Sequence, residues 1–280
     1  FQKLIRTGFS TNNVDHCTRL CHASSVAALL ETIGSGAVTA PFYEVEHSEV
    51  IIVIGANPTE NHPVAATFFK NAAKKGSKLI VMDPRGHALK KHATHMLQFK
   101  PGSDVALLNS IMHVIIEDDL FNDEYIKKQT SGFDDLRRHL KNYPPEIMEE
   151  QTGIDANLIR EVAHLYAKTS KGIIFWGMGV SQHVHGTDNA RCLISLALMT
   201  GNVGRRGSGL HPLRGQNNVQ GASDAGLIPM MYPDYQLVEK DDKQNFFEKF
   251  WNTSLDNKKG LTVVEIMDAI HENTIKGMYI

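Results

Sequence analysis

The chain has 280 residues, of which 42% are hydrophobic and 21% are charged, as in an ordinary globular protein. Its formal net charge of −2 argues against nucleic acid or an anionic membrane surface as a partner. No apolar run approaches the roughly 20 residues that a membrane-spanning helix needs. The opening residues also lack the layout of a signal peptide.

The three cysteines are too few for a disulfide framework, which predicts a reducing, cytoplasmic location. The chain opens without a methionine and stops within an apolar run. We therefore expect an internal fragment of a longer protein.

The apolar pattern alternates between short strands and longer helices. Strands are predicted over residues 50–54, 78–82, 96–99 and 172–176. Helices are predicted over residues 23–33, 63–75, 103–118 and 188–200, with several more between 122 and 169. This alternation predicts an α/β fold with a doubly wound, mostly parallel sheet that resembles a Rossmann dinucleotide-binding domain.

The pattern changes near residue 217. A long polar loop is expected there, followed by helices near residues 245–251 and 263–271. We therefore predict three parts. Residues 1–16 end a preceding α/β domain, residues 17–216 form the Rossmann-like domain, and residues 217–280 are part of a second α/β domain.

Each predicted strand is followed by a loop of glycine and polar residues. Ligands of open parallel sheets bind at the carboxyl ends of the strands, where acids take ribose or guanine groups and helix N-termini take phosphates. The sequence has neither a G-x-G-x-x-G nor a P-loop motif, so ordinary NAD or ATP binding is not expected. The alternative is that these residues serve only the turns.

The segment 213–224 places Arg214 among amide side chains and glycines, with no acidic residue before Asp224. A planar guanidinium with neutral hydrogen-bonding neighbours is suited to holding a small anion.

Two cysteines, Cys17 and Cys21, are four residues apart. The simplest interpretation of Cys17 is a small buried apolar residue, and a zinc site that uses both sulfurs and a histidine is an alternative. Cys21 is better explained as a single thiolate, with a pKa lowered by the N-terminus of the helix that follows it. His22 beside it can carry a proton.

Four motifs together closely resemble the catalytic subunit of molybdenum-dependent formate dehydrogenases, which are molybdopterin oxidoreductases of the dimethyl-sulfoxide-reductase type. They are Cys21-His22 before a helix of small residues, Trp176-Gly177-Met178-Gly179, Thr200-Gly201-Asn202-Val203-Gly204 and Arg214-Gly215-Gln216-Asn217-Asn218-Val219-Gln220-Gly221. The resemblance covers nearly the whole chain, and the last motif is its specific part.

The resemblance implies a Mo or W centre with two molybdopterin guanine dinucleotides, and Cys21 as the metal ligand. It implies that residues 17–216 bind one dinucleotide. The candidate residues are Gly55, Asn57, Glu60, Asn61, Met82, Asp83, Arg85, Gly102, Asp104, Gly177, Met178 and Gln182. A [4Fe-4S] cluster is expected only in a region that precedes this chain.

The activity implied is oxidation of formate to CO2, with Arg214 binding formate, His22 in proton transfer and Gln216 as a supporting residue. The implied partners are formate and an electron-acceptor subunit or NAD-reducing partner, without nucleic acid or a membrane span, and the fragment alone is expected to be inactive. A nitrate-reductase-like molybdopterin enzyme and a non-catalytic nucleotide-binding module are the alternatives.

Overall fold

The computed structural model describes all 280 residues, and its backbone packing divides the chain into two compact units. Residues Ser24–Leu213 form one, which we call the sheet unit. Phe1–Ala23 and Arg214–Ile280 together form the other, which we call the split unit. The functional division into domains at residues 16 and 216 stays a prediction.

A five-stranded parallel sheet is the centre of the sheet unit, in the order β3-β2-β1-β4-β5. Its strands are β1 (Val50–Ile54), β2 (Lys78–Met82), β3 (His95–Leu97), β4 (Gly172–Trp176) and β5 (Gly209–Pro212). The chain winds outward from β1 to β3, and then crosses to β4 on the other side. The α/β fold with a parallel sheet is confirmed, and the topological switch lies between β1 and β4.

Strand β5 was not predicted from the sequence. Gly209 begins it, Pro212 ends it, and only Leu210 between them is buried and apolar. It is a strand because it pairs with β4 at the sheet edge, where proline is tolerated. Because β5 has no apolar run of its own, the hydrophobic pattern of the sequence did not predict it.

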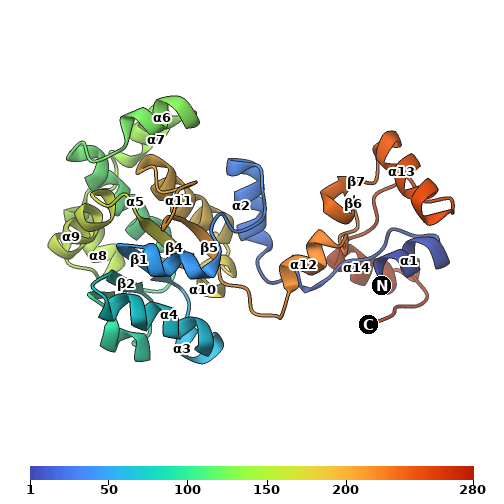
Figure 1. Cartoon of the computed structure of the whole chain (residues 1–280), viewed down its shortest axis with the longest axis horizontal. Coiled ribbons are helices and arrows are strands. Elements are labelled where there is room, and N and C mark those ends of the chain that lie inside the picture. The colour runs from blue at the N-terminus through green and yellow to red at the C-terminus, as the bar shows by residue number, and fades with distance from the viewer. The chain divides into compact units, whose positions relative to one another are not determined.

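Alternate residues of the strands face two separate cores. Val50, Ile52 and Ile54 pack with the helices α5 (Asp104–Glu117) and α11 (Gly186–Met199). Ile51 and Val53 pack instead with Phe69 and Ala72 of α4 (Pro63–Lys74). Figure 1 shows the sheet between these two groups of helices. Both faces are covered, so the central strands β1 and β4 are apolar and buried along their whole length.

The predicted helices of the sheet unit are present with nearly the predicted bounds, whereas the two short helices after β1 and β4 were not predicted. The helices are α2 (Ala23–Ile33), α3 (Pro58–Asn61), α4 (Pro63–Lys74), α5 (Asp104–Glu117), α6 (Asp123–Gln129), α7 (Phe133–Leu140), α8 (Pro145–Thr152), α9 (Ala156–Ala167), α10 (Met178–Ser181) and α11 (Gly186–Met199), with 3₁₀ turns at η2 (Phe42–His47) and η3 (Ala88–His92). Helix α2 is fixed to the end of β4, because Trp176 Nε1 donates to Ser25 Oγ at 2.8 Å.

The split unit consists of short helices around a two-stranded antiparallel ribbon. Its elements are α1 (Gln2–Gly8), η1 (Cys17–Arg19), α12 (Val219–Asp224), β6 (Met231–Tyr232), η4 (Pro233–Tyr235), β7 (Gln236–Leu237), α13 (Asp241–Trp251) and α14 (Val263–His271). The expectation of a continuous polar loop after residue 217 was wrong. Asn218 takes the left-handed conformation, with φ of 51°, and α12 follows it directly.

The N-terminal segment of the split unit is joined to the segment that follows α12 by a buried arginine, Arg6, which is 1% exposed. Its guanidinium donates to five neutral oxygen atoms, those of the Gln2 and Asn12 side chains and the carbonyls of Gly226, Ile228 and Met231. Figure 1 shows these two parts of the chain, blue and orange to red, side by side.

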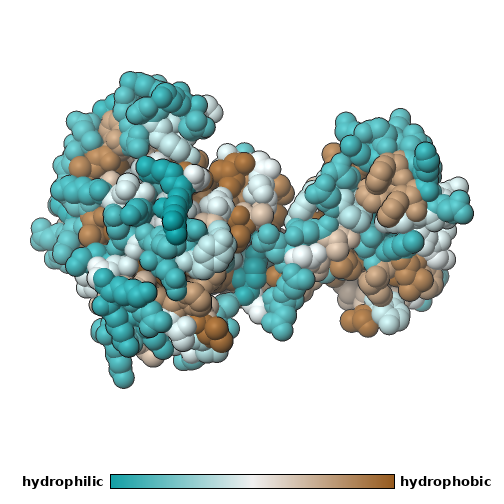
Figure 2. Space-filling model, viewed as in Figure 1, coloured by the Kyte–Doolittle hydropathy of each residue, from teal (hydrophilic) through white to brown (hydrophobic).

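A small apolar cluster completes the split unit. Tyr232, Val238, Phe247 and Leu255 are its buried members. Helix α13 turns Phe247 inward and leaves two further phenylalanines exposed. Figure 2 shows these apolar side chains as a pale brown patch over α13. No helix of the structure has the length and apolarity to cross a membrane.

Candidate functional site

The loops after β1 and β4 touch at the switch point of the sheet. The Gly177 N–H donates to the Ile54 carbonyl at 3.1 Å, and the Gly179 N–H donates to the Gly55 carbonyl at 3.0 Å. A Cβ on Gly55 would come within 2.8 Å of the Gly179 carbonyl carbon, and its φ of +57° also favours glycine. Glycine is therefore required for the two loops to approach each other here.

Three polar side chains are buried at the carboxyl edge of the sheet: Asn57 at 7% exposure, Asp83 at 5% and Asp104 at 2%. The Asp83 carboxylate accepts a hydrogen bond from the Arg85 N–H at 2.8 Å. Burial raises the pKa of Asp104, while its own backbone N–H and nearby His183 lower it. Carboxylates in such positions suit the N–H and O–H donors of a nucleotide.

The other candidate cofactor-binding residues differ in their exposure to solvent. Glu60, Asn61, Arg85, Gly102 and Gln182 are exposed, and Met178 is half-buried. Met82 is buried in the core with its side chain among apolar residues, so only its backbone can face a ligand.

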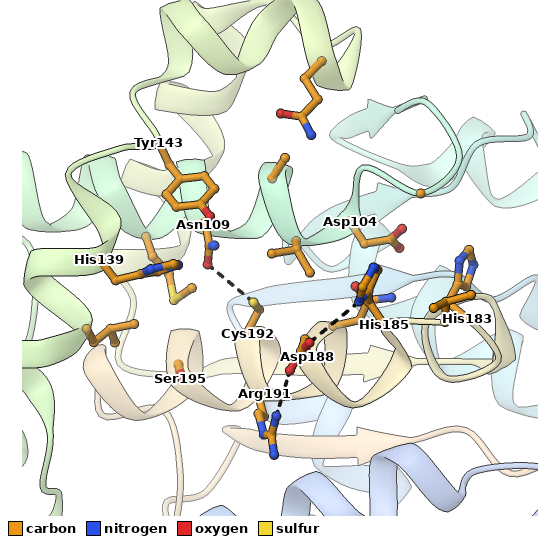
Figure 3. Close-up of a pocket in the computed structure, with 18 residues that line it drawn as sticks. Asp104, Asn109, His139, Tyr143, His183, His185, Asp188, Arg191, Cys192 and Ser195 are labelled. Atoms are coloured by element: carbon orange, nitrogen blue, oxygen red, sulfur yellow. Dashed lines mark hydrogen bonds and ion pairs between the residues drawn. The ribbon is translucent and has the colours of Figure 1, made fainter.

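A cavity of about 950 Å³ extends from this edge between helices α5, α7 and α11. Gly102 and Asp104 line one end of it together with His183 and His185. Figure 3 shows the two histidines near Asp104 at this end of the pocket.

The far end of the cavity has residues that the sequence did not suggest. His139 and Tyr143 form a ring pair there, with centroids 5.1 Å apart, and Cys192 Sγ lies 3.4 Å from Asn109 Oδ1. Asn109, His139 and Cys192 lie on helix faces and Tyr143 lies between α7 and α8, so no signal in the sequence separates them from ordinary packing or turn residues.

In the split unit, Cys21 lies close to the segment that begins at Arg214, although the two are far apart in the sequence. Cys21 is 8% exposed, and the backbone N–H of Gly215 forms a hydrogen bond with its sulfur. The positive charge of Arg214 also acts on the sulfur and favours its thiolate. A thiol and a guanidinium thus share one environment.

The expected lowering of the Cys21 pKa by the following helix was wrong. Burial raises the pKa of the Cys21 thiol, and the neighbouring Cys17 raises it further. Arg214 and the Gly215 N–H lower it by less than these effects combined. A soft metal bound to the sulfur would supply the missing positive charge.

Cys17 was expected to be buried, but it is exposed. It begins the 3₁₀ turn η1, which directs its side chain outward while its carbonyl accepts the Cys21 N–H at 3.0 Å. No group of three or more His, Cys, Asp or Glu side chains in the protein is arranged to hold a metal ion. The zinc alternative therefore gains no support.

The remaining predicted residues of this site differ in burial. His22 is completely buried and Gln216 is exposed. Their roles stay predictions.

The surroundings of Arg214 include titratable residues to which the sequence assigned no role in the site. His16 Nε2 lies 2.9 Å from Ser223 Oγ, and Tyr235 Oη donates to Asp224 at 2.9 Å. Burial lowers the pKa of Arg214, whereas the charges of Cys21, Tyr235 and Asp224 raise it. The position of Asp224 as the first acid after Arg214 was the only signal in the sequence.

A family model described as molybdopterin oxidoreductase matches residues 1–280. The chain is 43% identical to the F420-dependent formate dehydrogenase subunit alpha of Methanocaldococcus jannaschii, over 100% of this chain and 41% of that protein. It is 39% identical to formate dehydrogenase H of Escherichia coli, over 100% of this chain and 39% of that protein. The chain thus spans about two-fifths of the length of these curated relatives.

Among solved structures, acetylene hydratase from Pelobacter acetylenicus resembles the chain with a TM-score of 0.60 and 27% sequence identity. The match covers 67% of this chain and 25% of that one.

Proposed function

This chain belongs to the molybdopterin oxidoreductase family, and we propose that it is part of the catalytic subunit of a formate dehydrogenase, which oxidises formate to CO2. The observation that carries the proposal is the shared environment of Cys21 and Arg214. One is the residue type that ligates a soft metal, and the other binds a carboxylate. Two formate dehydrogenases among the relatives align with the whole chain.

The cofactor proposed is a Mo or W centre with two molybdopterin guanine dinucleotides. The residues of the sheet unit fit one dinucleotide, because buried Asn57, Asp83 and Asp104 stand at the carboxyl edge beside close-packed glycine loops. Cys21 would hold the metal, which when bound supplies the acceptor for the two electrons of formate.

Arg214 is proposed to bind the formate carboxylate and to orient its C–H bond. A charge-assisted contact of this type contributes about 1.5–3 kcal/mol, and correct positioning adds to it. The flexible point charge of lysine would not reproduce the planar fork. Gln216 is proposed to support the orientation of Arg214 or of the pterin.

Oxidation of formate releases one proton besides the two electrons and CO2. His22 follows Cys21 directly and is completely buried, so it is proposed to accept this proton at an imidazole nitrogen. Burial shields that nitrogen from bulk water.

The rest of the enzyme is also proposed from the resemblance. It includes a [4Fe-4S] cluster, an electron-acceptor subunit or NAD-reducing partner, and a cytoplasmic location. A nitrate-reductase-like reaction and a non-catalytic nucleotide-binding role remain the competing functions.

The test uses the full-length protein, purified with its cofactors. We expect about one Mo or W per chain and formate-dependent reduction of a dye, with no comparable activity on nitrate. Cys21→Ala and Arg214→Ala should each abolish formate oxidation, and Arg214→Lys should keep little of it. Wild-type turnover in either alanine variant would reject the proposed site, and a protein without Mo or W would favour the nucleotide-binding alternative.

A further inference from the structure

The far end of the cavity between α5, α7 and α11 has a wall from each of these three helices (Figure 3). Each helix contributes two lining residues three positions apart, a spacing that places both on one helix face. They are Asn109 and Met112 on α5, Leu136 and His139 on α7, and Cys192 and Ser195 on α11. All six belong to the sheet unit.

Asn109 is a buried amide with an unused donor. It is 3% exposed and lies in the middle of α5, most of which is buried. The Cys192 thiol donates to its Oδ1 at 3.4 Å. No protein atom accepts a hydrogen bond from its Nδ2, which is open to the cavity. A buried N–H group without an acceptor costs about 1–3 kcal/mol, so an acceptor on a bound molecule would be stabilised here.

Ser195 adds a second polar group without a partner in the protein. Its hydroxyl lies one turn along α11 from Cys192 and lines the same end of the cavity. The charged lining residues of α11 are paired instead, because Asp188 binds Arg191 at 2.7 Å and Arg191 also binds Glu31. The polar groups that α5 and α11 offer a ligand here are therefore neutral, which favours an uncharged ligand.

The remaining side chains favour a flat and mostly apolar ligand. Met112 and Leu136 are apolar, and the rings of His139 and Tyr143 lie on the solvent side with their centroids 5.1 Å apart. Aromatic side chains bind planar rings by stacked or edge-to-face contacts. The whole cavity measures about 950 Å³, within the range of about 300–1,000 Å³ that ligand pockets have.

We propose that the far end of this cavity is a second binding site, for an uncharged, planar heteroaromatic molecule that carries a carbonyl oxygen. The carbonyl accepts from the Asn109 amide and the Ser195 hydroxyl, and the ring lies against the apolar and aromatic side chains around them. The dinucleotide proposed above lies at the opposite end, beside Asp104. The second site contains neither Cys21 nor Arg214, so it does not rest on the oxidation of formate.

The probe is lumichrome, an uncharged, planar and fluorescent heteroaromatic compound with carbonyl groups. Its Kd for the full-length protein, purified with its cofactors, is measured by fluorescence anisotropy without formate. Asn109→Leu removes the donor and keeps a side chain of similar size, so the Kd should rise about tenfold, as for the loss of one hydrogen bond. Ser195→Ala should raise the Kd about threefold, because a hydroxyl shared with solvent contributes less.

Asn157→Leu is the matched control, because Asn157 is an exposed asparagine on α9 and does not line the cavity. Its Kd for lumichrome should equal that of the wild type. The thermal midpoint of each variant reports folding. Should Asn109→Leu unfold, Ser195→Ala decides the question, since alanine is well tolerated in a helix.

Guanosine monophosphate distinguishes the two ends of the cavity, because it resembles the part of the dinucleotide proposed beside Asp104. It should leave the Kd of lumichrome unchanged. Displacement of lumichrome by this nucleotide would overturn the second site. So would the absence of saturable binding to the wild type, or an equal Kd in the wild type and both cavity variants. A metal-loaded wild type that binds lumichrome but oxidises no formate would reject only the proposed function.

Discussion

The largest buried side chains of the sheet unit are those of Trp176, Tyr166, Phe69 and Phe175, whereas in the split unit they include the charged Arg6. The sheet unit has two apolar layers, one on each side of β1 and its neighbours. The split unit has only four residues in its buried apolar cluster. It supplements this small core with directional hydrogen bonds between its two chain segments.

Those bonds connect residues more than two hundred positions apart. The Asn12 amide donates to the carbonyls of Asp256 and Lys258 at 2.8 and 2.7 Å. Asn13 accepts from the Leu261 N–H, and Asp15 accepts from the N–H of Val263. Apolar burial stabilises without specifying direction, whereas this network requires each donor to meet its acceptor. The split unit should therefore be more sensitive to single polar substitutions.

Arg6→Met is expected to have the largest effect, because it removes the donor to all five oxygen atoms that accept hydrogen bonds from Arg6 and leaves several of them buried. Each such group costs about 1–3 kcal/mol, so the split unit should unfold while the sheet unit remains folded. The chain has two tryptophans, Trp176 in the sheet unit and Trp251 in the split unit. Fluorescence in single-tryptophan backgrounds therefore reports each unit during denaturation.

Lys3→Met is the matched control, since Lys3 is exposed on the same helix, α1. It should leave both transitions in place. A shift of the Trp176 signal as large as that of Trp251 in Arg6→Met would mean that the two units do not differ as argued.

Ile52→Ala tests the other side of the comparison. Ile52 is completely buried in the middle of β1, and its loss should destabilise by about 2–5 kcal/mol through lost burial and the cavity left behind. The effect should appear in the Trp176 transition of urea unfolding. Equal displacement of the Trp251 transition would contradict the assignment of separate cores.

The apolar layers explain why most of the sheet could be predicted. Val50–Ile54, Lys78–Met82 and Gly172–Trp176 are strands with the predicted bounds, because each is a short apolar run that ends at a turn residue. Strand β5 was not predicted, because its pairing with β4, and not its own composition, makes it a strand. The role of Arg6 was not predicted for a related reason, since three of its acceptors are backbone carbonyls far away in the sequence.

Prediction of the candidate site from the sequence was limited in the same way. The pairing of Cys21 with Arg214 was expected from the resemblance and not from any spacing in the sequence. The direction of the Cys21 pKa was wrong, because burial is a property of the folded chain and outweighs the local helix. The sequence identified Asp224 as the first acid after Arg214. Its hydrogen bond to Tyr235 was not predicted, because it depends on a left-handed turn that no sequence pattern indicates.

Gly55→Ala should have a smaller effect than the core substitution. The positive φ costs about 1–3 kcal/mol, and the new Cβ would meet the backbone of Gly179 at 2.8 Å for its carbonyl carbon. The Trp176 transition should shift, and the full-length variant should retain less guanine nucleotide after gel filtration. Gly34→Ala separates the two causes, since Gly34 has φ of +74° with open space around it. Equal shifts in both variants would show that contact between the loops does not matter.

The smallest effect is expected for Phe250→Ser on α13, which completes the comparison within the split unit. Phe250 is 72% exposed and stacks on Phe246 with centroids 6.0 Å apart, so its loss should change the free energy of unfolding by less than about 0.5 kcal/mol. Phe247→Ala on the same helix should cost about 3–5 kcal/mol, because Phe247 is 7% exposed and packs on Tyr232. Both are measured from the Trp251 transition in urea. Similar losses for the two variants would mean that the polar network, and not the small apolar cluster, sets the stability of the split unit.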